Sequence, residues 1–356
     1  RYVMAYKISV VAMIFSASAL ASTPQQNLSN IEQVTVLGKA SKYQTDLAGI
    51  DLKNLPLNAH TVHFEELERL HFVDPNEFLD RIPGETQVRN LRIPVGNKSY
   101  TIPMLDGMPL ESPYEGATQR LDRVNTSDIE RIEIIKGPAS ALYANNAFGG
   151  VVNVVSRKIA DEPQTKTSIE TGNLNRTRVG LYTSNSLDEL AYSFDFNSRR
   201  FDGMRDLEKN DRDQLSGKLA YKLGEKTQLT ARGEYLEEEQ VTRADLTAQQ
   251  LADDASQAGR LDASSELEQA TFSLRIQHQF TDADLDIQLA RREKDTIGLS
   301  RFRGPQDEND LAYTGRLVYN HSLKLGRISV GSDLYFSEQY TKRFARNDVE
   351  LTGDFN

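Results

Sequence analysis

Residues 129–155 constrain the fold of this chain more than any other segment. The run begins with isoleucines interleaved with charges, stops at Gly137-Pro138, and reaches Gly149-Gly150 before the apolar stretch Val151–Val155. Proline suits the first position of a helix, and glycine adopts backbone angles that other residues avoid. The run therefore predicts a strand, one helical turn, a glycine corner and a second strand.

Two earlier segments extend this pattern, Leu79–Gly84 and Leu105–Leu110, and Asp106-Gly107 in the second is a hairpin turn signal. In this order the three segments resemble the plug domain of TonB-dependent outer-membrane receptors. Several motifs in register are more specific than one glycine pattern. The residues that carry the structural motif are Asp106, Gly107, Glu130, Arg131, Lys136, Gly137, Pro138, Gly149 and Gly150.

The first residues predict export. Met4 and Lys7 precede the apolar run Ile8–Ile14, and Ala19-Leu20-Ala21 fits a signal-peptidase site. Residues 1–21 are therefore predicted to be a signal peptide, with cleavage after Ala21 or, alternatively, after Ala19. The chain has no cysteine, so disulfides and thiolate chemistry are excluded.

Residues 22–45 are predicted to be a polar linker with one short β-favouring string, Ile31–Gly38. The string resembles the TonB box, which pairs as an added strand with the periplasmic energy transducer TonB. Considered alone, it fits an ordinary edge strand better, but its position between a signal peptide and a plug-like domain favours the TonB box. The residues assigned to the box are Ile31, Glu32, Gln33, Val34, Thr35, Val36, Leu37 and Gly38.

Residues 46–160 are the predicted plug domain, of α+β class. Within it, residues 64–70 and 74–81 read as short helices, and Asp74 is a suitable N-cap because Pro75 follows it. Residues 161–356 then alternate apolar and polar positions, as in Leu215–Leu223 and Phe272–Phe280. This alternation predicts antiparallel strands of a membrane barrel, with lipid outside and water inside.

Loop lengths support the barrel. Short connections are predicted near 185–189, 224–226, 281–283 and 322–326, and longer ones near 201–211, 241–267 and 296–310, after a small first loop near 172–175. Tight periplasmic turns alternate with long outer loops in such barrels. A soluble β-sandwich also has alternating strands and remains the alternative.

The expected fold is an α+β plug inside a transmembrane antiparallel β-barrel. We count about nine strands in residues 161–356, whereas barrels that enclose a plug have about 22. The chain is therefore predicted to be a fragment that contains only the N-terminal portion of the barrel.

No catalytic or metal site is predicted. His60 and His63 lie in a strand-like stretch, where positions three apart face opposite sides. Carboxylate clusters at residues 237–239, 253–254 and 307–310 lack calcium-loop spacing and read as solvated charge. No enzymatic activity and no resident cofactor are expected, although the transported ligand is expected to be an iron chelate.

The resemblance places ligand contacts on the upper loops of the plug. Arg and Tyr combine charge-assisted hydrogen bonds with flat contact area, which suits a bulky anion. Leu91–Gly96 stands where the family usually has an Arg-Gly pair. The candidate contacts are Arg89, Arg92, Tyr100 and Tyr114.

The resemblance implies a Gram-negative outer-membrane receptor that imports a scarce ligand with energy from TonB, most often a ferric siderophore. Cobalamin, haem and oligosaccharide are alternative cargoes, and a secreted β-rich binding protein or adhesin is an alternative class. A net charge of −10 argues against nucleic acid as a partner. The expected partners are TonB, a small ligand and membrane lipid.

Overall fold

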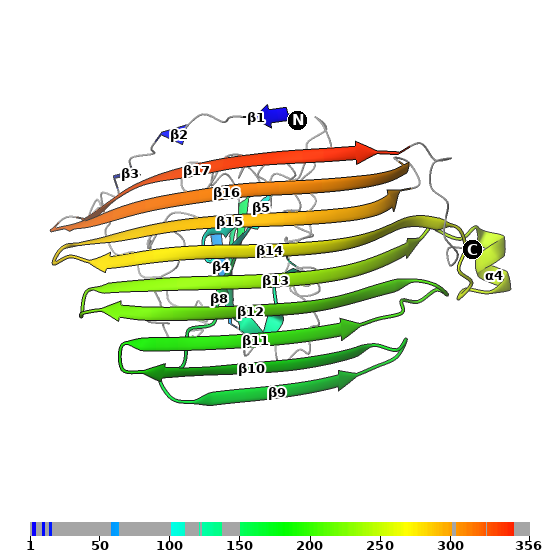
Figure 1. Ribbon diagram of the computed structural model, residues 1–356, viewed down its shortest axis with the longest axis horizontal. Helices are drawn as coiled ribbons and strands as arrows, with labels where there is room; N and C mark the ends of the chain where they lie inside the picture. Colours follow the sequence, from blue (N-terminus) through cyan, green and yellow to red (C-terminus); the bar gives the residue numbers. More distant parts are fainter. Residues whose placement is uncertain are drawn as a thin grey trace, which may run out of the picture.

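The computed structural model describes residues 2–4, 9–10, 14–15, 58–63, 101–110, 121, 123–136, 150–300, 304–324 and 326–344. These residues form two sheets, a small one and a large one (Figure 1). The expected plug helices at residues 64–70 and 74–81 lie outside the described residues. No helix within the described ranges is both long enough and apolar enough to cross a membrane.

The small sheet contains both strands predicted in residues 129–155. Its order is β4 (Asn58–His63), β7 (Ile129–Lys136), β8 (Gly150–Ser156), β5 (Thr101–Leu105) and β6 (Met108–Pro109). β5 and β8 are parallel, and the other neighbours are antiparallel. The sheet has an apolar core because the isoleucines of β7 and the valines of β8 pack together, with Val62, Leu121 and Val124 beside them.

The predicted turn at Asp106-Gly107 joins β5 to β6. Both residues have left-handed angles, with φ of 51° at Asp106 and 82° at Gly107. Asp and Gly tolerate this region best, which explains why this pair occupies a two-residue hairpin.

The large sheet is one antiparallel series of nine strands in chain order, as predicted. Figure 1 shows them as a stack from β9 to β17, with the small sheet behind its middle. Their bounds are β9 Gln164–Thr171, β10 Thr177–Leu187, β11 Leu190–Arg200, β12 Lys209–Leu223, β13 Thr227–Arg243, β14 Leu261–Gln279, β15 Ala283–Ser300, β16 Gly304–Leu323 and β17 Gly326–Arg343.

The sheet does not close on itself. β9 forms one edge, and at the other edge β17 pairs with three short strands near the N-terminus. These are β1 (Tyr2–Met4), β2 (Ser9–Val10) and β3 (Ile14–Phe15), all antiparallel to β17. The sheet is an open half-barrel.

Most predicted connections are found. Residues 188–189, 224–226 and 280–282 make short turns at one end, and residues 201–208 and 244–260 make longer loops at the other. The second long loop contains α4 (Ala248–Asp253), whose start is fixed by a Thr247–Gln250 capping box.

The long loop predicted at Thr296–Asp310 is wrong. β15 continues to Ser300 and β16 starts at Gly304, in unbroken register from Ser300↔Gly304. The carboxylates read as loop charge are accommodated in the strand because β15 supplies cations, with Arg292 at 3.1 Å from Asp310 and Lys294 at 3.7 Å from Glu308. Strict alternation of short and long connections therefore fails here.

The large sheet has its apolar side chains on the outside. Leu215, Leu219, Phe272, Leu274 and Leu289 are exposed, whereas the intervening side chains that face the small sheet are polar and buried. Among the buried ones are Asp195, Arg212, Lys218, Arg232, Gln288, Arg292 and Arg316. A soluble sandwich buries the apolar face instead, so this polarity separates the two architectures left open by the sequence.

Candidate functional site: the interface between plug and wall

Part of the predicted site lies outside the described residues. This applies to the whole string Ile31–Gly38, to the candidate ligand contacts Arg89, Arg92, Tyr100 and Tyr114, and to Gly137, Pro138 and Gly149. Of the structural motif, Asp106 and Gly107 form the β5–β6 turn, Glu130, Arg131 and Lys136 lie on β7, and Gly150 begins β8.

Three of these motif residues, Gly107, Glu130 and Arg131, belong to one hydrogen-bonded network inside the small sheet, together with Glu133 and Asn153. Gly107 N donates to Asn153 Oδ1 at 2.9 Å, and Asn153 Nδ2 donates to Glu133 Oε2 at 3.1 Å. Arg131 then bridges Glu133 at 2.9 Å and Glu130 at 2.8 Å. Because Glu133 and Asn153 are fully buried, this satisfied network fixes the hairpin against β7 and β8.

Asp106 continues the network from the small sheet, which belongs to the predicted plug, toward the large sheet β9–β17, called the wall from here on. Its two carboxylate oxygens accept hydrogen bonds from Ser156 N at 2.7 Å and Ser156 Oγ at 2.6 Å. Lys218 on β12 donates to Ser156 Oγ at 2.9 Å. Burial alone raises the pKa of Asp106, but Arg232, Lys218 and the Ser156 hydrogen bonds outweigh it and lower the pKa below its ordinary value. The carboxylate is therefore held ionised.

Asp128 is the centre of the first contact between plug and wall. It belongs to the 3₁₀ turn Thr126–Asp128, and Asn125 caps that turn by accepting from Ser127 N. Its carboxylate pairs with Lys218 of β12 at 2.9 Å and with Arg232 of β13 at 2.6 Å. All three side chains are at most 8% exposed, so the pairs are strong and poorly screened.

A second ion pair lies beside the first. Arg123 Nε contacts Glu238 Oε2 at 3.3 Å, and Glu238 also pairs with Arg212 of β12 at 2.7 Å. Glu238 was read from sequence as solvated charge in a run of three glutamates. Its inward position on β13 instead buries it, so that interpretation is wrong for Glu238.

The β5–β6 hairpin makes the third contact, with strands further along the wall. Arg316 on β16 donates to Gly107 O at 3.1 Å, and Arg292 on β15 donates to Leu110 O. Charged donors to carbonyl oxygens are stronger than neutral ones. The plug is thus held at two separated places, by β12–β13 and by β15–β16.

A cavity of about 530 Å³ lies between these contacts. Leu105, Asp106 and Met108 line it from the plug, and polar wall residues such as Gln228, Thr230, Gln277 and Gln288 line it from the large sheet. It also reaches Asp188 and Glu189 in a short turn, so it extends to the end of the wall where the short turns lie. Such a polar space between plug and wall accommodates water or a polar solute.

Sequence reasoning missed the wall residues of this interface, namely Lys218, Arg232, Arg292 and Arg316. One signal was available, because each stands at a polar position of an alternating strand. Alternation identifies the inward face but does not say which inward charges meet the plug. Within the described residues, no three His, Asp or Glu side chains are grouped to hold a metal ion.

Comparison with known proteins agrees with this geometry. Residues 51–151 match the model of the TonB-dependent receptor plug domain. Residues 51–151 are a TonB-dependent receptor plug domain. The resemblance inferred from the motifs in residues 79–155 is thereby confirmed.

One relative is the iron-regulated outer membrane virulence protein of Vibrio cholerae serotype O1, which is 28% identical over 202 residues. The match covers 52% of this chain and 27% of that protein. This chain therefore aligns with about a quarter of the curated relative, and it also spans only about half of the solved receptors described next.

Solved receptors share the fold. The ferric citrate transporter FecA, unliganded, has a TM-score of 0.65 at 18% identity, and the match covers 80% of this chain and 48% of FecA. The ferric yersiniabactin uptake receptor FyuA of Yersinia pestis gives 0.66 at 14% identity, covering 80% and 49%. The alcaligin receptor FauA of Bordetella pertussis gives 0.64 at 14%, covering 84% and 51%. The predicted fold class, plug and barrel strands, is confirmed.

Proposed function

We propose that this chain forms the plug and first wall strands of an outer-membrane receptor that takes up a ferric siderophore with energy from TonB. One observation carries the proposal most: a plug held by buried ion pairs against the polar inner face of a sheet whose outer face is apolar. This arrangement closes a membrane pore until the plug moves. Catalysis is not part of the proposed role.

The cargo proposal rests on the relatives. Their names mention ferric citrate, ferric yersiniabactin, alcaligin and iron regulation. On this basis we place ligand contact at Arg89, Arg92, Tyr100 and Tyr114, whose side chains suit a bulky anionic chelate. Cobalamin, haem and oligosaccharide are the competing cargoes.

The proposed mechanism follows from the resemblance to TonB-dependent receptors. Ligand binding outside shifts the plug between two states by its differential affinity for them, and makes Ile31–Gly38 available to TonB. TonB adds a strand to this segment and pulls. The pull must separate Asp128 from Lys218 and Arg232, which widens the cavity beneath the hairpin into a passage.

Uptake of labelled ferric siderophores by cells that depend on the receptor tests this role. Deleting Ile31–Gly38 is expected to abolish uptake while leaving surface binding of the ligand unchanged. A scrambled linker at residues 39–45 serves as the control and should keep uptake. Unchanged uptake after the deletion would refute the role of the segment. If cells needed the receptor for growth on cobalamin but not for growth on ferric siderophores, the cargo would be reassigned to cobalamin.

A further inference from the structure

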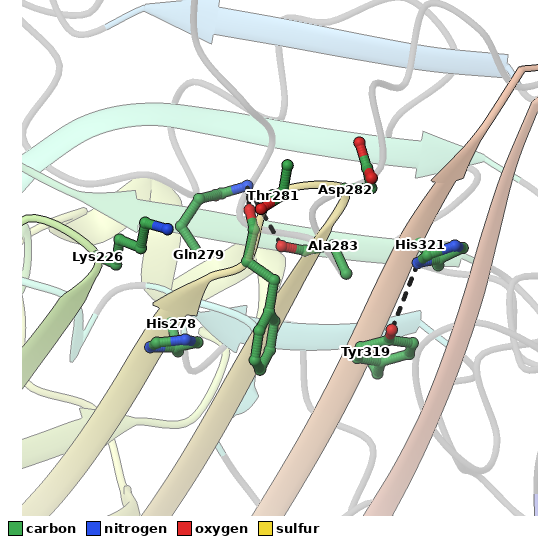
Figure 2. A pocket seen from close by; sticks show the side chains of 9 residues that line it. Lys226, His278, Gln279, Thr281, Asp282, Ala283, Tyr319 and His321 are labelled. Carbon is green, nitrogen blue, oxygen red and sulfur yellow. Dashed lines mark hydrogen bonds between the residues drawn. The ribbon is translucent and has the colours of Figure 1, made fainter.

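A hollow of about 370 Å³ opens on the outer side of the large sheet, at the end where the short turns lie. It lies on the opposite face of the sheet from the interface with the plug and has different chemistry. Its lining is aromatic and charged, with Lys226, His278, Phe280, Asp282, Tyr319 and His321 around the turn that joins β14 to β15 (Figure 2).

The pairing register places this hollow at the margin of the apolar band. On the outer face, Ile276, Ile287 and Leu317 form one continuous row across β14, β15 and β16. The next row toward the short turns is His278, Leu285 and Tyr319, and beyond it lie Phe280 and His321. Apolar rows thus give way to aromatic and basic ones, as at a membrane–water interface.

Hydrogen bonds and ring contacts orient the two histidines. His278 Nδ1 lies 2.7 Å from Thr227 Oγ1, and its ring meets the edge of Phe280 with centroids 4.3 Å apart. His321 stacks on Tyr319, with its Nδ1 at 3.4 Å from the Tyr319 hydroxyl. Within the described residues the hydrogen bonds of both rings are made through Nδ1, and Figure 2 shows both rings beside the turn.

The charges around the hollow have both signs. Lys226 and Asp282 are exposed and lie on opposite sides of Thr281 in Figure 2. A ligand that fits must therefore present an anion toward Lys226 and the imidazoles, and a cation toward Asp282. It must also continue into an apolar part along Ile276 and Leu317, because the hollow adjoins that row.

We infer that this hollow binds the phosphoethanolamine headgroup of a phospholipid. The phosphate accepts from the Lys226 ammonium and the imidazole N–H groups, and the primary ammonium donates to the Asp282 carboxylate. The acyl chains lie along the apolar rows above. The inference rests on the proposed membrane location, and it adds a preference for one zwitterionic lipid that the receptor family's fold alone does not supply.

Native mass spectrometry of the whole receptor tests the inference. The receptor is purified in detergent and incubated with equimolar phosphatidylethanolamine, phosphatidylcholine and phosphatidylglycerol of identical chains. We expect retained phosphatidylethanolamine to exceed the other two by about tenfold, because choline cannot donate to Asp282 and glycerol carries no cation. Asp282→Asn should remove this preference, whereas Lys226→Gln should lower the retention of all three lipids, because each of them carries the phosphate.

Two variants at other short turns serve as matched controls. Lys324→Gln and Asp188→Asn alter exposed residues of the same types that do not line the hollow, and both should keep the preference. Equal retention of the three lipids, or stronger retention of phosphatidylglycerol, would overturn the inference. A receptor recovered without detergent would instead contradict the proposed membrane function, so the two failures are distinguishable.

Discussion

At the residue scale, single inward charges of the wall determine how the plug is held. A continuous series of hydrogen bonds and ion pairs runs from the plug hairpin to β13, through Asp106, Ser156, Lys218, Asp128 and Arg232. Asp128 has two cationic partners in it and Asp106 accepts two hydrogen bonds from Ser156, which offsets the cost of removing these carboxylates from water. This series of contacts holds the plug firmly. Because the contacts are polar, hydrogen bonds to water can replace them when the plug is pulled.

Asp128 is the residue whose loss should weaken this contact most. Asp128→Asn leaves Lys218 and Arg232 buried without their shared carboxylate, and breaking a buried pair in this way costs about 3–5 kcal/mol. We expect the free energy of unfolding of the receptor in detergent to fall by that order. Urea titration measures it. Asp245→Asn, on an exposed loop, is the control and should change little; equal stability of both variants would contradict the role of Asp128.

At the element scale, the sequence allows the strands to be predicted better than their ends. Isoleucine and valine runs identify β7 and β8, and alternation identifies the nine wall strands, because side chains on a strand alternate between two faces. The β15–β16 connection escaped prediction since Asp307–Asp310 has loop-like composition. Only the register reveals that Lys294 stands opposite Asp310, with Arg292 diagonal to it and close enough to pair.

The β5–β6 hairpin, which contains the motif residues Asp106 and Gly107, connects the small sheet to the wall. Its Gly107 has φ of 82°, its N–H binds Asn153 and its carbonyl accepts from Arg316. Gly107→Ala forces a side chain into left-handed backbone, which costs about 1–2 kcal/mol, and we expect a corresponding loss of stability in thermal unfolding. Gly233→Ala on β13 is the control, because nothing lies within 4 Å of the added carbon. Equal melting temperatures for the two variants would contradict this view of the turn.

At the scale of the whole molecule, the chain inverts the usual arrangement of a soluble protein. The small sheet has its own apolar core, whereas the large sheet turns its apolar side chains outward and encloses polar ones. The apolar core of the small sheet and the apolar outer face of the large sheet have one cause, because the side chains on each face match the polarity of what that face contacts. The plug meets a polar wall, so ion pairs rather than apolar packing join the two sheets.

This inversion makes opposite faces of adjacent strands respond differently to the same substitution. Leu274 on β14 is exposed in the middle of the apolar rows, whereas Gln228 on β13 faces the cavity. Leu274→Arg places a charge in hydrocarbon and should destabilise the receptor in lipid vesicles by about 2–4 kcal/mol. A substitution on the inner face instead alters the selectivity of the interior. Gln228→Arg should therefore change the free energy of unfolding by less than about 0.5 kcal/mol. Urea titrations in vesicles compare the two variants. A larger loss from Gln228→Arg would mean that the outer face of the sheet does not contact lipid.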